Sequence, residues 1–133
     1  MNFEIGQEHK EEVSFSFEDV KKYAELSGDK NPIHIDPEYA KKTPFGRCIV
    51  HGMFASSKFS KVLATSFPGE GTVYLEQNLE FKKPIFPDEK YNLIMTIAEK
   101  KVTSSGKTIY KIETKIVDLA NNICVNGKAT VLK

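Results

Sequence analysis

A carboxylate and an imidazole occur close together in one short segment of the chain. In Asp29-Lys-Asn-Pro-Ile-His34 the two groups are five residues apart, and the Asn-Pro step favours an extended or turn backbone. In such a loop both side chains can converge on one small volume. A carboxylate beside an imidazole can hold one water molecule from two sides and transfer its protons. The pattern therefore favours a reaction that adds water or removes it.

A second segment, His51-Gly52-Met53, opens a stretch that is predicted to be a long helix. The first N–H groups of a helix have no partner within it, and the positive end of the helix dipole lies there. Gly52 has no Cβ, so a carbonyl oxygen can approach its N–H closely. A thioester oxygen that gains negative charge during a reaction would be stabilised at this position.

Three residues are candidates for contacts with the substrate rather than for proton transfer. Arg47 is the only arginine of the chain, and a guanidinium can hold a phosphate or carboxylate with two parallel hydrogen bonds. A plain surface charge is the alternative for Arg47. His51 and Met53 lie on either side of Gly52, and His51 is expected to cap or pack at the helix start rather than to take part directly in the chemistry.

Structural roles and a metal site are the alternatives for the polar side chains. Taken alone, Asp29 suits the end of a helix or an Asx turn, and His34 could be a hydrogen-bonded buried imidazole. Asp29, His34, Asp36 and His51 are also types that bind metal ions. No two of them have the spacing of ligands on one helix face, and no cysteine joins them. The sequence therefore predicts no metal.

Two helices are predicted on either side of the Asp29–His34 segment. The first begins at Ser16, which forms a capping-box pattern with Asp19, and ends at Gly28. The second is a long central helix over about residues 51–67, followed by Pro and Gly. Residues 29–50 between them are predicted to be mostly ordered loop, with one short helical turn opened by Asp36-Pro37.

Beyond the central helix the apolar period changes from 3.6 residues to 2, which predicts strands over about residues 73–81, 91–97, 110–116 and 123–131. The first of these is expected to bury one face. Short turns between successive strands imply an antiparallel meander. A long helix and such a sheet can bury their apolar faces only against each other, so the predicted fold is α+β, with the sheet wrapped around the helix.

The size and composition of the chain limit its class. Its 133 residues predict a single domain over residues 1–133. The 19 basic and 18 acidic residues nearly cancel and the lysines are scattered, which argues against nucleic acid as a partner. No apolar run approaches the ~20 residues of a membrane helix, and no targeting segment is recognised, so a cytoplasmic location is expected. Cys48 and Cys124 are expected to be reduced thiols.

The segment G-D-x-N-P-I-H-x-D-P-E-Y-A, which begins at Gly28, is followed by I-V-H-G-M at residues 49–53. Together they resemble the hydratase motif of the MaoC-like family of (R)-specific enoyl-CoA hydratases. Phe81-Lys-Lys-Pro-Ile-Phe-Pro-Asp88 resembles the downstream strand and turn of that family. The resemblance covers roughly residues 13–131. It departs at Pro87-Asp88-Glu89, where the family often has Pro-Gly-Asp, and this puts the turn geometry in question.

This resemblance implies a hot-dog fold, a homodimer, and hydration of a trans-2-enoyl thioester to the (R)-3-hydroxyacyl thioester. The substrate would be an acyl-CoA or acyl-carrier-protein thioester, and no cofactor is expected because coenzyme A is part of the substrate. Asp29 and His34 match the catalytic dyad, and Gly52 matches the residue whose N–H receives the thioester oxygen. Ser60 matches a hydroxyl that supports the dyad, and Asn31 matches the residue that shapes the loop.

Two other functions stay open at this point. The hot-dog fold also hosts acyl-CoA thioesterases, and a fold does not determine its chemistry. A non-catalytic module that binds acyl thioesters is the alternative outside enzymes, although an intact dyad argues against it.

Overall fold

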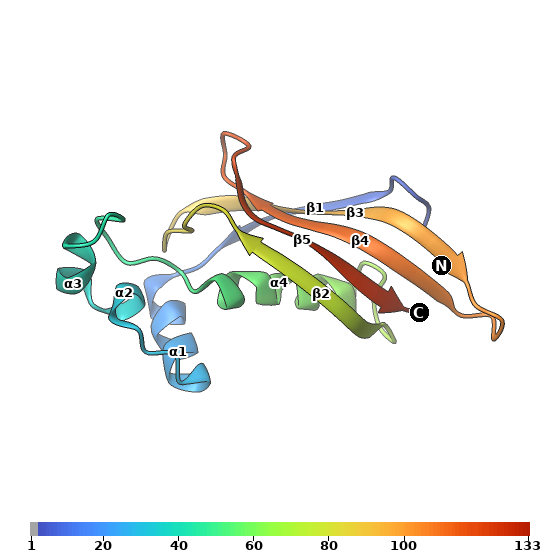
Figure 1. Ribbon diagram of the computed structural model, residues 1–133, viewed down its shortest axis with the longest axis horizontal. Helices are drawn as coiled ribbons and strands as arrows, with labels where there is room; N and C mark the ends of the chain where they lie inside the picture. Colours follow the sequence, from blue (N-terminus) through green and yellow to red (C-terminus); the bar gives the residue numbers. More distant parts are fainter. Residues whose placement is uncertain (1–2) are drawn as a thin grey trace.

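The structure is a computed structural model that describes residues 3–133, and in this part of the chain it contains four helices and five strands. Their order along the chain is shown in Figure 1. The elements are β1 (Glu8–Ser14), α1 (Phe17–Ser27), α2 (Pro32–Ile35), α3 (Pro37–Lys41), α4 (Gly52–Thr65), β2 (Val73–Phe81), β3 (Lys90–Val102), β4 (Thr108–Val117) and β5 (Ile123–Leu132).

Helix α1 begins and ends where the sequence predicted. The Ser16 hydroxyl accepts a hydrogen bond from the Asp19 N–H at 3.0 Å, which satisfies one of the free donors of the first turn. At the other end Gly28 adopts a φ of 81°, and its N–H donates to the Ala24 carbonyl. This left-handed residue ends the helix and turns the chain directly into the Asp29 loop.

The segment after α1 is more helical than predicted. Asp36 caps α3, as expected, because its carboxylate accepts the N–H groups of Glu38 and Tyr39. A further helical turn, α2, is formed where loop was predicted, and Asn31 caps it by accepting the Ile33 N–H at 3.2 Å. A proline at the first helical position of each turn lacks only an N–H that would be unpaired there.

The five strands form one antiparallel sheet with the order β1-β3-β4-β5-β2. The antiparallel pairing was predicted, but the meander was wrong in one respect, because β2 pairs with β5 and not with β3. The connection over residues 82–89 carries the chain across the end of the sheet. Hydrogen bonds from the Lys82 N–H to the Cys124 carbonyl and from the Val50 N–H to the Ile85 carbonyl hold it there.

Strand β1 was not predicted, because its sequence is charged and Val13 is its one buried residue. As an edge strand it needs only hydrogen bonds to β3 and cover on one face. His9, although it lies in this charged segment, is partly buried, and its Nε2 lies 2.9 Å from the Glu11 carboxylate. The same carboxylate accepts a hydrogen bond from Lys61 of α4 at 2.9 Å, so β1 is tied to the helix.

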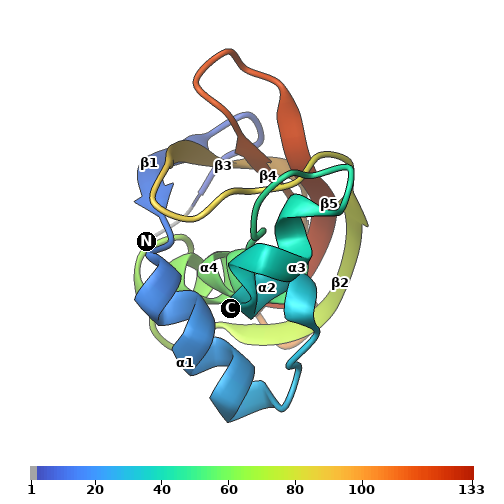
Figure 2. The same cartoon turned by 90° about the vertical axis from the view of Figure 1, so that its left-hand side faces the viewer.

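Helix α4 lies along the concave face of the sheet, and Figure 2 shows the strands curving around it. Phe59 and Val62 of the helix are fully buried, and they form one apolar cluster with inward side chains of β3, β4 and β5 such as Leu93, Ile112 and Val131. The predicted α+β arrangement of a sheet wrapped around one helix is therefore confirmed. None of the helices in residues 3–133 has the length and apolar character that crossing a membrane requires.

Strand β2 does not bury an apolar face as predicted. Val73, Leu75 and Phe81 are 51%, 52% and 54% exposed. The strand is an outer edge of the sheet with a neighbouring strand on one side only, so much of its surface stays exposed in this chain. Between β2 and α4 lies a groove of about 450 Å³. Its lining is mixed, with Met53, Ser56, Ser57, Ser60, Tyr74, Leu75, Glu76, Gln77 and Leu79.

We predict that Gly127→Ala weakens the pairing of β2 with β5. A β-carbon at Gly127 would lie 2.1 Å from the backbone carbonyl oxygen of Asn78, and a paired backbone cannot move aside cheaply. The free energy of unfolding, measured by urea denaturation, should fall by about 1–3 kcal/mol. Lys128→Ala, on the next and exposed residue of the same strand, should have little effect. Equal stability of Gly127→Ala and the wild type would contradict this prediction.

Candidate active site

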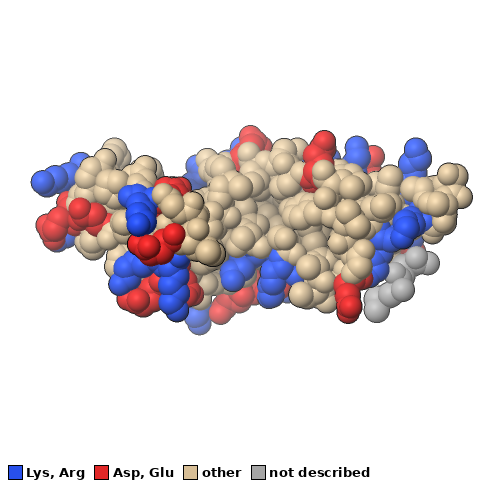
Figure 3. Space-filling view, turned by 90° about the horizontal axis from the view of Figure 1, so that it is seen from below, with Lys and Arg blue, Asp and Glu red and all other residues tan. Residues whose placement is uncertain are grey.

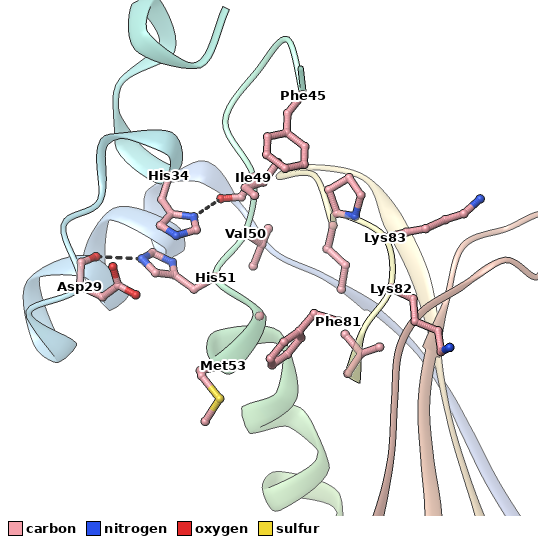
Figure 4. A pocket seen from close by; sticks show the side chains of 14 residues that line it. Asp29, His34, Phe45, Ile49, Val50, His51, Met53, Phe81, Lys82 and Lys83 are labelled. Carbon is pink, nitrogen blue, oxygen red and sulfur yellow. Dashed lines mark hydrogen bonds between the residues drawn. The ribbon is translucent and has the colours of Figure 1, made fainter. Parts of the chain in front are cut away.

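A pocket of about 500 Å³ lies between the Asp29 loop, the start of α4 and the connection that follows β2. Figure 4 shows the side chains that line it. Charged groups gather over α1 to α3 on the face shown in Figure 3, whereas the middle of this face is largely uncharged. The lining residues are Asp29, His34, Phe45, Ile49, Val50, His51, Gly52, Met53, Phe81, Lys82, Lys83, Pro84, Ile85 and Val125.

Three polar side chains meet at one end of the pocket. An oxygen of the Asp29 carboxylate and one ring nitrogen from each of His34 and His51 all lie within 4.8 Å of one another. The loop holds the carboxylate because the Asn31 N–H donates to Asp29 Oδ1 at 3.4 Å, and Asn31 also caps α2. The predicted convergence of Asp29 and His34 is therefore found, and Asn31 does shape the loop between them. Their catalytic roles stay predictions.

His34 belongs to α2 and is held in place by the segment that precedes α4. Its side chain is 9% exposed, and its Nδ1–H donates to the Ile49 carbonyl at 2.7 Å. A carbonyl can only accept, so the neutral ring carries its proton on Nδ1 and its lone pair on Nε2. His34 can therefore accept a proton at Nε2 and return it.

His51 is more deeply buried, at 2% exposure. Its Nε2–H donates to the backbone carbonyl of Asp29 at 3.0 Å, and its ring stacks on that of His34 with centroids 3.7 Å apart and planes inclined by 23°. Burial lowers the pKa of His51 below the ordinary value of 6.5, and the neighbouring His34 lowers it further, whereas the Asp29 carbonyl acts in the opposite direction. His51 is therefore neutral at physiological pH.

This lowered pKa predicts that the fold loses stability in mild acid. An unfolded chain protonates His51 near pH 6.5, while the folded chain resists protonation until a lower pH. The stabilisation by neutral His51 is complete above this value and is lost as the pH falls below it, with a slope of at most about 1.4 kcal/mol per pH unit. The free energy of unfolding of the wild type should therefore fall as the pH drops below about 6.5. His51→Gln should show a smaller fall, and an identical fall in both proteins would contradict the prediction.

The same three side chains are close enough together to be compared with a metal site. The lone pair of an imidazole nitrogen lies in the ring plane, and the planes of His34 and His51 are nearly parallel and stacked. Two stacked rings cannot both direct their lone pairs at one ion in tetrahedral geometry. Asp36, the fourth candidate ligand, caps α3 with its carboxylate. The arrangement suits proton transfer better than metal binding, and the absence of a metal stays a prediction.

Gly52 is the first residue of α4 and lines the pocket. As the first helical residue it has an N–H without an acceptor inside the helix, at the positive end of the helix dipole. A β-carbon at this position would lie 2.6 Å from the ring of Phe81, which belongs to β2. The sequence explained this glycine by the approach of a ligand, and the structure adds the close packing of Phe81.

The other predicted site residues differ in their positions. Met53 is 59% exposed and lines both the pocket and the groove beside β2. Arg47 lies outside the pocket, because its guanidinium pairs with Glu89 and lies over the ring of Phe86 at 3.8 Å. Ser60 lines the groove and not the pocket. It lies eight positions after Gly52, roughly 12 Å along the helix axis, so it does not reach the dyad of its own chain.

Several pocket residues were not named from the sequence as site residues. Phe81, Lys82 and Lys83 come from the end of β2 and the connection after it, and the two lysine side chains extend away from the histidines (Figure 4). Phe45, which is 43% exposed, adds an apolar wall. The segment that begins at Phe81 was recognised as part of a family motif, but only its path across the end of the sheet brings it to the pocket.

The departure from the family pattern at Asp88 does not break the turn. Asp88 adopts a φ of 65°, the left-handed conformation that glycine adopts most easily and aspartate tolerates better than most residues. Its N–H donates to the Phe15 carbonyl at 2.7 Å, which anchors the connection to the start of α1. Asp88 therefore adopts the conformation that a glycine would favour at this position of the turn.

Comparison with known proteins identifies relatives along nearly the whole chain. The family described as "MaoC like domain" matches residues 2–121. The chain is 38% identical over 132 residues to an (R)-specific enoyl-CoA hydratase of Aeromonas caviae, with 98% of this chain and 95% of that protein covered. It is 40% identical over 130 residues to a mitochondrial 3-hydroxyacyl-[acyl-carrier-protein] dehydratase of Arabidopsis thaliana, with 96% and 76% covered.

The fold has solved counterparts. The structure of an (R)-hydratase from A. caviae involved in PHA biosynthesis superimposes with a TM-score of 0.90 at 36% identity, and the match covers 97% of this chain and 96% of that one. The expected hot-dog architecture is thereby confirmed. The family match, the two relatives and this fold together show that the chain belongs to the MaoC-like family.

Proposed function

We propose that the protein is a hydratase that adds water reversibly to trans-2-enoyl thioesters and forms (R)-3-hydroxyacyl thioesters. The observation that carries this proposal is the meeting of the Asp29 carboxylate and the His34 imidazole in a pocket that is also lined by Gly52, the first residue of α4. The names of the relatives agree with it, since they are an enoyl-CoA hydratase and a 3-hydroxyacyl dehydratase.

The three groups have complementary roles in this reaction. Asp29 and His34 hold one water, and the lone pair on His34 Nε2 takes a proton as the water oxygen attacks C3 of the substrate. The negative charge that moves to the thioester oxygen is stabilised by the Gly52 N–H and the helix dipole. The proton held by the dyad is then delivered to C2, so that the atoms of one water are added across the double bond.

The substrate is an acyl thioester of coenzyme A or of acyl carrier protein, and the names of the two relatives each mention one of these carriers. Lys82 and Lys83 at the edge of the pocket are placed to meet a phosphate of either carrier. Arg47, which was expected to do so, is engaged with Glu89 outside the pocket. We expect no cofactor, since coenzyme A enters as part of the substrate.

A homodimer is the assembly that we propose. Strand β2 is an edge strand, and Val73, Leu75 and Phe81 expose apolar surface along it. An unpaired apolar edge is stabilised when a second copy covers it across a two-fold axis. Light scattering after gel filtration should give twice the mass of one chain, and a monomer at micromolar concentration would reject the dimer.

We also propose a cytosolic location, although the Arabidopsis relative is mitochondrial.

The activity is tested with crotonyl-CoA and octenoyl-CoA. Hydration removes the near-ultraviolet absorbance of the conjugated thioester, and chiral analysis of the product should give the (R) enantiomer. Release of free thiol without hydration would identify a thioesterase instead. Binding of acyl-CoA with neither reaction would identify a non-catalytic module, and either result would overturn the proposed function. Incubation with a chelator should leave the rate of hydration unchanged.

A further inference from the structure

His51 does not act as the side-chain cap of its own helix. It occupies the N-cap position of α4, yet its side chain makes no capping hydrogen bond there. The ring turns instead toward the loop after α1, where Nε2 meets the Asp29 carbonyl at 3.0 Å (Figure 4). The best N-cap residues are serine, threonine, aspartate and asparagine, so helix capping does not explain a histidine at this position.

The His51 ring restrains both members of the dyad. Its N–H holds the backbone carbonyl of Asp29, the residue that carries the carboxylate. Its face lies 3.7 Å from the face of His34, which limits the rotation of that ring. Tyr23 of α1 contacts the His51 ring at 4.7 Å between centroids, so the restraint is anchored to a helix.

The same surroundings prevent His51 from exchanging protons. A carbonyl acceptor fixes the proton on Nε2, which leaves the lone pair on Nδ1. Nδ1 is completely buried and has no hydrogen-bond partner among residues 3–133. A proton there would be a buried donor without an acceptor, a costly arrangement, and it would place a charge against the ring of His34.

We propose that His51 is a positioning residue of this site, which holds the Asp29 backbone through Nε2–H and the His34 ring through stacking, and which stays neutral throughout the reaction. This inference rests on the proposed function for its kinetic consequences. It replaces the expectation that His51 binds substrate, because a side chain that is 2% exposed offers a ligand almost no surface.

Two variants of His51 separate the contribution of its N–H donor from that of its stacked ring. His51→Phe keeps an aromatic face but has no N–H, whereas His51→Gln keeps an N–H donor at a similar reach but has no ring. Misplacement of a catalytic group by about 1 Å costs on the order of 10²-fold in rate. We expect His51→Phe to lower kcat by about 10²-fold with KM within about 3-fold, and His51→Gln to recover at least about 10-fold of this loss.

A structural measurement tests the proposal independently of activity. Nitrogen-15 NMR of the histidine rings in the wild type should show His51 neutral and protonated on Nε2, and His34 protonated on Nδ1. In His51→Phe the signal of His34 should broaden or shift because its stacking partner has changed. If the wild type shows no hydration, the proposed function fails, and these spectra still decide the positioning role.

Several results would overturn the inference. They are an unchanged kcat in His51→Phe, a kcat in His51→Gln no higher than in His51→Phe, and a His51 that is protonated on Nδ1 at neutral pH. Circular dichroism and thermal unfolding establish that each variant is folded before its kinetics are compared. If His51→Phe does not fold, the wild-type spectra and the kinetics of His51→Gln decide.

Discussion

Replacing Asp29 by asparagine, or His34 by alanine, is expected to lower kcat for enoyl-thioester hydration by about 10²–10⁴-fold, the usual contribution of a placed proton-transfer group. Asparagine keeps the shape of the side chain but loses the negative charge with which the carboxylate holds the water and favours the transfer of its proton to His34. Alanine removes the Nε2 lone pair that the hydrogen bond to Ile49 leaves available. Loss of absorbance of crotonyl-CoA under saturating conditions measures the effect.

Matched controls separate this effect from a loss of structure. Asp19→Asn on α1 and His9→Ala on β1 change the same residue types outside the pocket and should retain turnover close to that of the wild type. Asp29 is exposed, so its variant should also unfold at nearly the wild-type temperature. If both dyad variants hydrate the substrate at near-normal rates, the assignment of the dyad is wrong.

The second large effect is expected at the tip of α4, where two substitutions of Gly52 isolate its N–H. Alanine adds a β-carbon and keeps the N–H, whereas proline adds a β-carbon and removes it. Proline is well tolerated at the first position of a helix, and His51 already has φ −57° and ψ 130°, as a residue before proline requires. Loss of one oxyanion donor costs about 10²–10³-fold in kcat, so Gly52→Pro should be slower than Gly52→Ala by this factor.

The comparison of Gly52→Pro with Gly52→Ala is valid only if both substitutions have the same effect on the shape of the pocket. Both variants add the same β-carbon, which must displace the ring of Phe81, so this displacement is common to the two proteins. Calorimetric binding of butyryl-CoA, a saturated analogue that does not react, should give similar affinities if the pocket stays open in both variants. Equal kcat values for Gly52→Pro and Gly52→Ala would show that this N–H does not stabilise the reaction.

The local signals of the sequence were sufficient for the ends of α1 and for the approach of Asp29 and His34, whereas the helical turn α2 was not predicted. Ser16 and Gly28 specify the ends of α1 through hydrogen bonds to residues three or four positions away. The Asn-Pro step and the Asn31 cap shape the loop from which the Asp29 and His34 side chains approach each other. Interactions of this range can be inferred from residue types and spacing alone.

Strand order depended on contacts that the sequence does not encode locally. Antiparallel pairing followed from the short turns, but the position of β2 beside β5 is the result of a connection that crosses the end of the sheet. The same crossing brings Lys82 and Lys83 to the pocket and takes Arg47 to Glu89. Strand β1 was not predicted, because its charged sequence lacks the apolar alternation of a strand. An edge strand can nevertheless be charged and still pair with its neighbour.

The sequence by itself therefore predicted that the Asp29 and His34 groups converge and that a helix begins at about Gly52, because these features depend on residues that are near one another along the chain. Only the tertiary structure decided how those groups are held. The ring of His51 stacks on His34, its Nε2–H binds the Asp29 carbonyl 22 residues away, and Phe81 closes over Gly52 from another strand. Such contacts arise when the chain packs its distant segments together, and no periodicity or spacing records which segments will meet.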